Sequence, residues 1–122
     1  MGEMVDIPQV ECPLLHFHPP GVFVRQITMP KGSLILSRMH HVEHAYTISK
    51  GSCRVWTAED GVQDYVAPWT GITKPGTVRI LFMHEDTVWT TYHPNPDNIT
   101  DPDEFVNMVT SIPVIQRKEI TV

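Results

Sequence analysis

Turn signals built on glycine and proline interrupt this sequence about every 8–12 residues. The runs between them are short and rich in Val, Ile, Thr, Tyr, Phe and Trp, which favour strands because branched and aromatic side chains pack well on a pleated sheet. Regular short strands of this kind predict an all-β sandwich or barrel. The predicted strands are VFVRQIT (22–28), SLILSRM (33–39), HAYTIS (44–49), CRVWT (53–57), QDYVA (63–67), TVRILFM (77–83) and TVWTTYH (87–93). Residues 68–71 (PWTG) are predicted to form one of the intervening turns.

One short helix is expected near the C-terminus, at roughly residues 101–110. The stretch TDPDE (100–104) reads as an N-cap followed by proline and acidic residues, which suit a first helical turn. Phe105, Met108 and Val109 then have helical spacing. Pro113 ends this helix, and VIQRKEITV (114–122) is expected to form a final strand. Because no linker or repeat interrupts the chain, we predict one domain over 1–122 with a core at about 20–93.

Composition excludes several classes of protein. A chain of 122 residues can bury a core without staples. Its net charge of −5 provides no basic patch for a nucleic-acid backbone. It contains no apolar run near the ~20 residues that span a bilayer. The polar start MGEMVDIPQVE lacks a signal-peptide core, so we expect a cytoplasmic protein in which Cys12 and Cys53 are reduced.

The stretch HHVEH at residues 40–44 concentrates groups that bind metals. On a helix, His40-x-x-Glu43-His44 would match an inverted zinc-protease motif. Its flanks are strand-forming and bounded by Gly32 and Gly51, which favours a corner between two strands instead. Four residues of straight strand span about 13 Å, too far for two ligands on one ion. His40 and His44 could therefore share a metal only if residues 41–43 form a short connection.

The spacing around this stretch resembles the first motif of the cupin family. The chain reads Gly32, five residues, Arg38, one residue, His40, three residues, His44, six residues, Gly51. The cupin motif is glycine, five residues, His-x-His, three or four residues, Glu, six residues and glycine. Arg38 stands at the first His, His40 at the second, and His44 at the Glu. The resemblance implies that residues 41–43 connect two strands and that His40 and His44 lie at the metal site.

A second stretch resembles the other cupin motif, Pro-x-Gly-x-x-His-x-x-x-Asn. In Lys74-Pro75-Gly76-Thr77-Val78-Arg79 the glycine is kept, Arg79 stands at the His, and Met83 follows at the Asn. The resemblance covers roughly residues 20–93 and implies a single cupin-type (jelly-roll) β-barrel. Small cupin barrels often dimerise, so it also implies a homodimer or higher homo-oligomer, with the terminal segments as candidates for exchange between subunits.

The chain is also similar to small cupin-like proteins encoded in tailed-phage genomes. The stretches that carry this similarity are ITMPKGS, ISKG, KPGT and HEDTVWTTYHP, together with the His40 and His44 pair. The similarity implies a source in a phage genome, with the host cytoplasm or the virion as the location.

A third ligand comes from the strand at 87–93. If 77–83 and 87–93 form a hairpin through His84-Glu85-Asp86 with a three-residue turn, His93 lies opposite Arg79 and faces the site. A two-residue turn would point it outward. His84-Glu85-Asp86 is predicted to be a charged turn, although Glu85 could reach a nearby metal. The metal hypothesis is thus His40, His44 and His93 around Zn, Fe, Mn, Ni or Cu.

A metal-free pocket is the alternative to this centre. Arg38 and Arg79 would project into the same pocket, where guanidinium groups favour a carboxylate or phosphate ligand. We also count Tyr46 as a candidate ligand-binding residue. Three classes of function follow: a metal-dependent enzyme acting on a small anionic molecule, a binding module for a small anion, and a phage structural or assembly component that uses the barrel as a scaffold.

Overall fold

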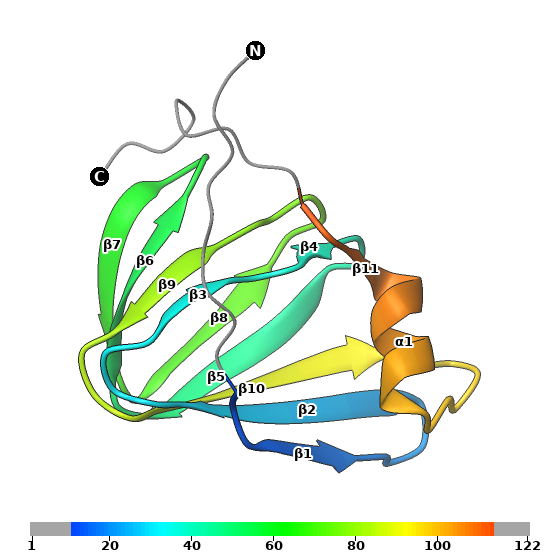
Figure 1. Cartoon of the computed structure of the whole chain (residues 1–122). Coiled ribbons are helices and arrows are strands. Elements are labelled where there is room, and N and C mark those ends of the chain that lie inside the picture. The colour runs from blue at the N-terminus through cyan, green and yellow to red at the C-terminus, as the bar shows by residue number, and fades with distance from the viewer. Residues whose placement is uncertain (1–10, 114–122) are drawn as a thin grey trace.

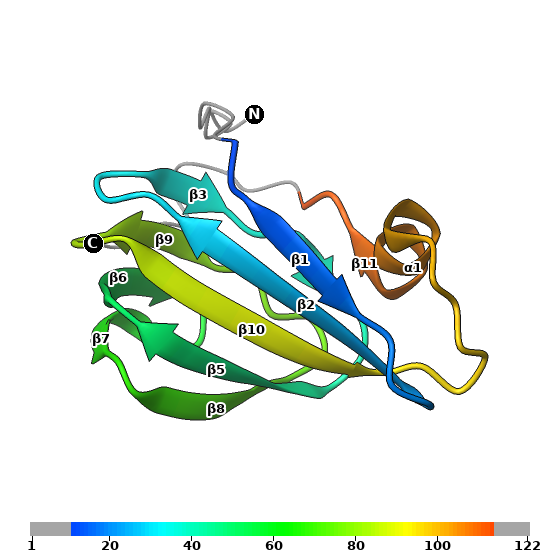
Figure 2. The ribbon, with the colours of Figure 1, turned by 90° about the horizontal axis from the view of Figure 1, so that it is seen from below.

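Two antiparallel β-sheets face each other and enclose most of the core (Figure 1). The computed structural model describes residues 11–113. The larger sheet has the order β1-β2-β10-β5-β8, and its strands are β1 (Leu14–Phe17), β2 (Val22–Met29), β10 (Thr87–Pro94), β5 (His44–Lys50) and β8 (Trp69–Thr73). The smaller sheet has the order β3-β9-β6-β7, and its strands are β3 (Leu34–Leu36), β9 (Ile80–Met83), β6 (Ser52–Thr57) and β7 (Gly61–Val66). Figure 2 shows the larger sheet from its outer side.

The main core lies between these sheets, because both contribute to one cluster of buried side chains. The larger sheet supplies Met29, Tyr46, Ile48 and Trp89. The smaller sheet supplies Cys53, Val55, Leu81 and Met83. The alternation of side chains along each strand sends every second residue into this space. On β10, Trp89 and His93 are only 6 % and 5 % exposed, whereas Tyr92 is 39 % exposed.

One helix, α1 (Pro102–Val109), closes an end of the barrel (Figure 1). Asp101 caps it by accepting a hydrogen bond from the backbone N–H of Asp103, and Pro102 occupies the first turn, where its missing N–H costs nothing. Phe105 stacks on Phe23 of β2 with the ring centroids 4.2 Å apart. The helix leads directly into β11 (Thr110–Ser111), which pairs with β4 (Met39–His40). The helix therefore lies beside the HHVEH stretch.

The predicted all-β barrel with one short helix is confirmed, but several predicted elements were wrong. The predicted strand 33–39 divides into β3 and β4. Strand β1 was not predicted, and the predicted turn at 68–71 begins strand β8. Gly71 suggested a turn, yet it is glycine for a different reason: a Cβ there would lie 2.7 Å from the hydroxyl of Tyr46. The expected final strand at 114–122 and the N-terminal exchange segment lie outside the described residues.

The predicted hairpin between 77–83 and 87–93 was also wrong. Strand β9 belongs to the smaller sheet and pairs with β3 and β6, whereas β10 belongs to the larger sheet between β2 and β5. The chain crosses from one sheet to the other at residues 84–86. Residues 84–86 are therefore a connection between the two sheets and not a hairpin turn.

Candidate metal centre

Three histidines from three strands meet at the end of the barrel that α1 covers. His40 ends β4, His44 begins β5, and residues 41–43 form the connection between them, as predicted. His93 lies near the end of β10, and its backbone pairs with Phe23. One ring nitrogen from each histidine lies within 4.8 Å of one from each of the others. We call His40, His44 and His93 the histidine cluster.

The three imidazole rings pack directly against each other. The ring centroids of His44 and His93 are 3.8 Å apart in a stacked arrangement. The His40 ring lies 4.7 Å from the His44 ring and 5.8 Å from the His93 ring. Phe105 of α1 meets the His93 ring edge-on at 5.6 Å, which helps to exclude water from this side.

Several nitrogens of the cluster are buried without a hydrogen-bond partner among the described residues. They are Nδ1 of His40, Nε2 of His44 and both ring nitrogens of His93. Buried polar groups without partners are costly and rare in native proteins. Because one nitrogen from each of the three rings can face a common point, the cluster matches a site where an ion or a ligand supplies the missing partner.

The cluster is held in the neutral form that metal binding requires. Burial, together with the smaller effect of the neighbouring histidines and arginines, lowers the pKa of His40 and that of His93 to about 3. Burial also lowers the pKa of His44. Near neutral pH all three imidazoles are therefore unprotonated, each with a lone pair available. The cluster can thus present three neutral nitrogen ligands, a set that suits divalent transition metals.

A cavity of about 210 Å³ lies next to the cluster and is lined by both His40 and His93. Arg38 and Arg79, the residues at the first-motif and second-motif His positions, also line it. Arg38 donates hydrogen bonds to Thr110 at 2.7 Å and Asn107 at 3.1 Å. Both predicted arginines therefore share the cavity with the cluster, as expected, but Arg38 is already held by the helical segment.

Arg79 and Tyr46 are both buried and lie in contact inside the barrel. Arg79 donates to the hydroxyl of Thr73 at 3.0 Å, and its guanidinium lies 4.9 Å from the centre of the Tyr46 ring. Tyr46 does not line the cavity beside the cluster. It lines a second cavity of about 430 Å³, to which Arg79 also contributes. Its hydroxyl accepts a hydrogen bond from Trp69 Nε1 at 3.2 Å.

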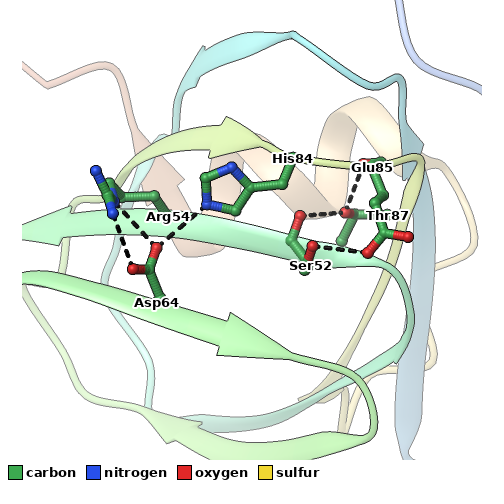
Figure 3. Close-up of polar contacts among 6 residues, drawn as sticks. All are labelled: Ser52, Arg54, Asp64, His84, Glu85 and Thr87. Carbon is green, nitrogen blue, oxygen red and sulfur yellow. Dashed lines mark hydrogen bonds and ion pairs between the residues drawn. The ribbon is translucent and has the colours of Figure 1, made fainter.

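Glu85, which might have reached the metal from the predicted charged turn, is not part of the cluster. It accepts a hydrogen bond from Ser52 at 2.8 Å on the exterior of the barrel (Figure 3). In the same region Asp64 accepts from Arg54 at 3.0 Å and from His84 at 3.2 Å, and these contacts lower the pKa of Asp64 to about 2. None of the residues in this exterior network lines the cavity beside the cluster.

Sequence reasoning missed Arg25. This residue of β2 lines the cavity beside the cluster, and its Nε is buried without a partner among the described residues. The signal was present in VFVRQIT, where strand alternation places Arg25 on the same face as Phe23 and Ile27. An arginine between two apolar residues on the inner face of a strand indicates a charge directed into the barrel.

Known structures share this fold at low sequence identity. A comparison with protein-family models found no match, and a comparison with curated proteins found none. An uncharacterised conserved protein with a double-stranded β-helix domain from Klebsiella pneumoniae is 16 % identical over 78 % of this chain and 86 % of that one, with a TM-score of 0.59. An RmlC-like cupin from Desulfovibrio desulfuricans is 15 % identical over 74 % and 89 %, with a TM-score of 0.57.

KdgF from a Halomonas species gives a similar result, with 14 % identity over 79 % of this chain and 94 % of that one and a TM-score of 0.56. The similarity to phage-encoded proteins finds no support in these comparisons and stays a prediction. Among the described residues, no helix is long and apolar enough to cross a membrane. The agreement in strand arrangement shows the double-stranded β-helix, or jelly-roll, fold of the cupins.

Proposed function

We propose that this chain is a metal-binding protein of cupin fold, in which His40, His44 and His93 hold a divalent transition metal next to a cavity for a small anionic molecule. One observation carries the proposal: one ring nitrogen from each of three neutral imidazoles lies within 4.8 Å of those from the other two. Across the three rings, four nitrogens are buried without partners among the described residues. An ion would bind one nitrogen from each ring at once, whereas a water molecule, which has two hydrogens, could donate to at most two of them.

The donor set narrows the metal to a class. Three imidazoles suit Zn(II), Fe(II), Mn(II), Ni(II) or Cu(II), and they leave coordination positions for water or a ligand. His44 has the outer contact common among metal-binding histidines, because its Nδ1 donates to the carbonyl oxygen of Val42. When bound, such a metal can polarise a carbonyl group or lower the pKa of a bound water. The adjacent arginines would orient an anionic substrate toward it.

A metal-free anion-binding module is the second candidate, and the charge of the cavity favours it. Three arginines line the cavity, and no acidic residue does among those that the structure describes. An excess of positive charge in a largely apolar cavity favours an anion whether or not a metal is present. The scaffold role in a phage particle and the homodimer stay predictions, which sedimentation of the purified protein, alone and with virions, would test.

The proposal is tested by metal analysis of protein purified without a histidine tag. We expect a near-stoichiometric transition metal by inductively coupled plasma mass spectrometry, and its loss in His40→Ala, His44→Ala and His93→Ala. His41→Ala is the matched control, because His41 is exposed and adjacent to His40 but outside the cluster. It should retain the metal. No uptake by the wild-type protein after incubation with Zn(II), Fe(II), Mn(II), Ni(II) and Cu(II) would overturn the metal proposal and leave the anion module.

A further inference from the structure

The cavity beside the histidine cluster has one charged region and a large apolar wall. Its volume of about 210 Å³ is below the range of drug-sized sites, so it suits a small ligand. Apolar side chains from both sheets and from α1 make up most of the wall. Among them are Phe23 and Trp89 of the larger sheet, Leu81 of the smaller sheet, and Phe105 and Val109 of α1.

Two of the three arginines in this cavity already have partners. Arg38 donates to Thr110 and Asn107, so it fastens the helical segment to the barrel. Arg79 donates to Thr73 and lies over the rings of Tyr46 and Trp89, at 4.9 and 5.4 Å from their centres. Their guanidinium groups are therefore directed by the protein itself, which leaves Arg25.

Arg25 is placed for recognition of a ligand. Its Nε is buried and lacks a hydrogen-bond partner among the described residues. Its backbone pairs with Thr91, two positions before His93 on β10, and side chains at such diagonal positions are neighbours on a sheet. Its charge contributes to the lowered pKa of both His40 and His93. A charged donor without a partner thus lies next to the cluster.

We propose that Arg25 is the anion-binding residue of the cavity and that its ligand is a small carboxylate with an apolar body. Nε–H and one terminal N–H of a guanidinium point in the same direction, so they can donate two parallel hydrogen bonds to the two oxygens of one carboxylate. The apolar body then contacts the wall formed by the sheets and α1. An orientation of the carboxylate end toward a metal rests on the proposed function, whereas the contact with Arg25 does not.

A phosphate fits these features less well. A phosphate dianion needs several charged donors at once, and Arg38 and Arg79 are held by other groups. Inorganic phosphate has no apolar group that could pack against the extensive apolar wall. The one guanidinium that the described residues do not hold, that of Arg25, and the apolar wall together select a monocarboxylate.

Isothermal titration calorimetry with 3-methylbutanoate, benzoate, the uncharged 3-methylbutanamide and inorganic phosphate tests the proposal. Each probe is titrated into the metal-loaded and the chelator-treated protein. We expect the two carboxylates to bind, and the amide and phosphate to bind at least ten-fold more weakly. Arg25→Met, which keeps the apolar stem, should weaken carboxylate binding about 10- to 100-fold, since a hydrogen bond to a charged group contributes that much. Arg25→Lys should give an intermediate loss.

Arg54→Met is the matched control, because Arg54 is exposed and pairs with Asp64 on the exterior. It should bind the carboxylates as the wild type does. Thermal melts of each variant confirm folding. Unchanged affinity in Arg25→Met, tighter binding of phosphate, or no carboxylate binding in either form would overturn the proposal. Metal uptake without carboxylate binding would refute this inference alone, whereas Arg25-dependent binding without metal uptake would refute only the metal centre.

Discussion

Nδ1 of His44 lies 2.9 Å from the backbone carbonyl oxygen of Val42. Because a carbonyl can only accept, the ring donates its proton there and retains the lone pair on Nε2. That Nε2 is buried without a partner among the described residues. The connection at 41–43 thus brings His44 to the cluster and also selects which of its nitrogens is available.

This contact predicts the tautomer of His44. In metal-free protein near pH 7, long-range ¹H–¹⁵N NMR spectra should show His44 neutral with its proton on Nδ1. Adding Zn(II) should change the Nε2 shift and leave the Nδ1 proton in place. A proton found on Nε2 in the metal-free protein would contradict the assignment.

Metal binding should raise thermal stability. A ligand that binds only the folded state at a free concentration 100 times its Kd contributes about 2.7 kcal/mol to the free energy of unfolding. Melting curves of wild-type protein with Zn(II) and with chelator should therefore differ by several degrees. His93→Ala should show no such difference, whereas His41→Ala should behave as the wild type. An equal gain in His93→Ala would place the binding elsewhere.

Metal-free protein should lose stability as the pH falls below 6.5. Burial depresses the pKa of His40 and of His93 from 6.5 to about 3, so between these values the unfolded chain binds protons that the folded chain does not. The contribution of these two histidines to the free energy of unfolding is therefore complete above pH 6.5 and decreases as the pH falls toward 3. The slope is at most about 1.4 kcal/mol per pH unit for each histidine.

Urea titrations from about pH 7 to pH 4.5 measure this slope. That window stays above 3.8, the ordinary pKa of an aspartate, below which Asp64 would add its own loss of stability. His40→Asn and His93→Asn should each give a shallower slope. Slopes equal to that of the wild type would show that these side chains are protonated in the folded state.

Gly71→Ala should destabilise the barrel. The added Cβ would lie 2.7 Å from the hydroxyl oxygen of Tyr46 and 2.8 Å from its Cζ, and Tyr46 is held between the two sheets. Overpacking of this kind costs about 1–3 kcal/mol in the free energy of unfolding. In a Tyr46→Ala background the same change should cost much less, which chemical denaturation of the four proteins would show. Equal costs in both backgrounds would refute the steric explanation.

Arg38→Ala should loosen the helical segment rather than abolish anion binding. Arg38 is joined to Thr110 and Asn107, and hydrogen bonds to a charged group contribute about 1.5–3 kcal/mol. Hydrogen exchange of the backbone amides at 103–110 should therefore accelerate. Arg54→Ala removes a surface pair and should leave these amides unchanged. Unaltered exchange in Arg38→Ala would show that α1 is held by Phe105 and Val109 alone.

Local patterns predicted much of the fold. The β-branched runs identified most strands, and the spacing of Phe105, Met108 and Val109 identified the helix. Gly71 misled because its small size serves a contact with Tyr46 on another strand, which no local pattern reveals. His93 was expected at the site through a hairpin that does not exist. It faces inward because β10 pairs with β2 and β5, partners that are distant in sequence.

Arg25 shows a second kind of information that the sequence lacks. Its inward direction follows from strand alternation, but its importance depends on the partners that Arg38 and Arg79 find in Thr110 and Thr73. These partners are distant in the sequence, so the free donor could be recognised only after the others were accounted for. A sequence pattern predicts which face of a strand a side chain occupies, whereas only the three-dimensional structure shows which polar groups on that face lack a hydrogen-bond partner.

The histidine cluster joins residue 40 to residue 93 across β4, β5 and β10. An ion held there would act as a cross-link that closes most of the barrel's chain into one loop. Closing a long loop restricts the unfolded ensemble more than closing a short one. The three side chains that form the metal site would then also stabilise the folded barrel, and removal of the ion would abolish both the site and this stabilisation.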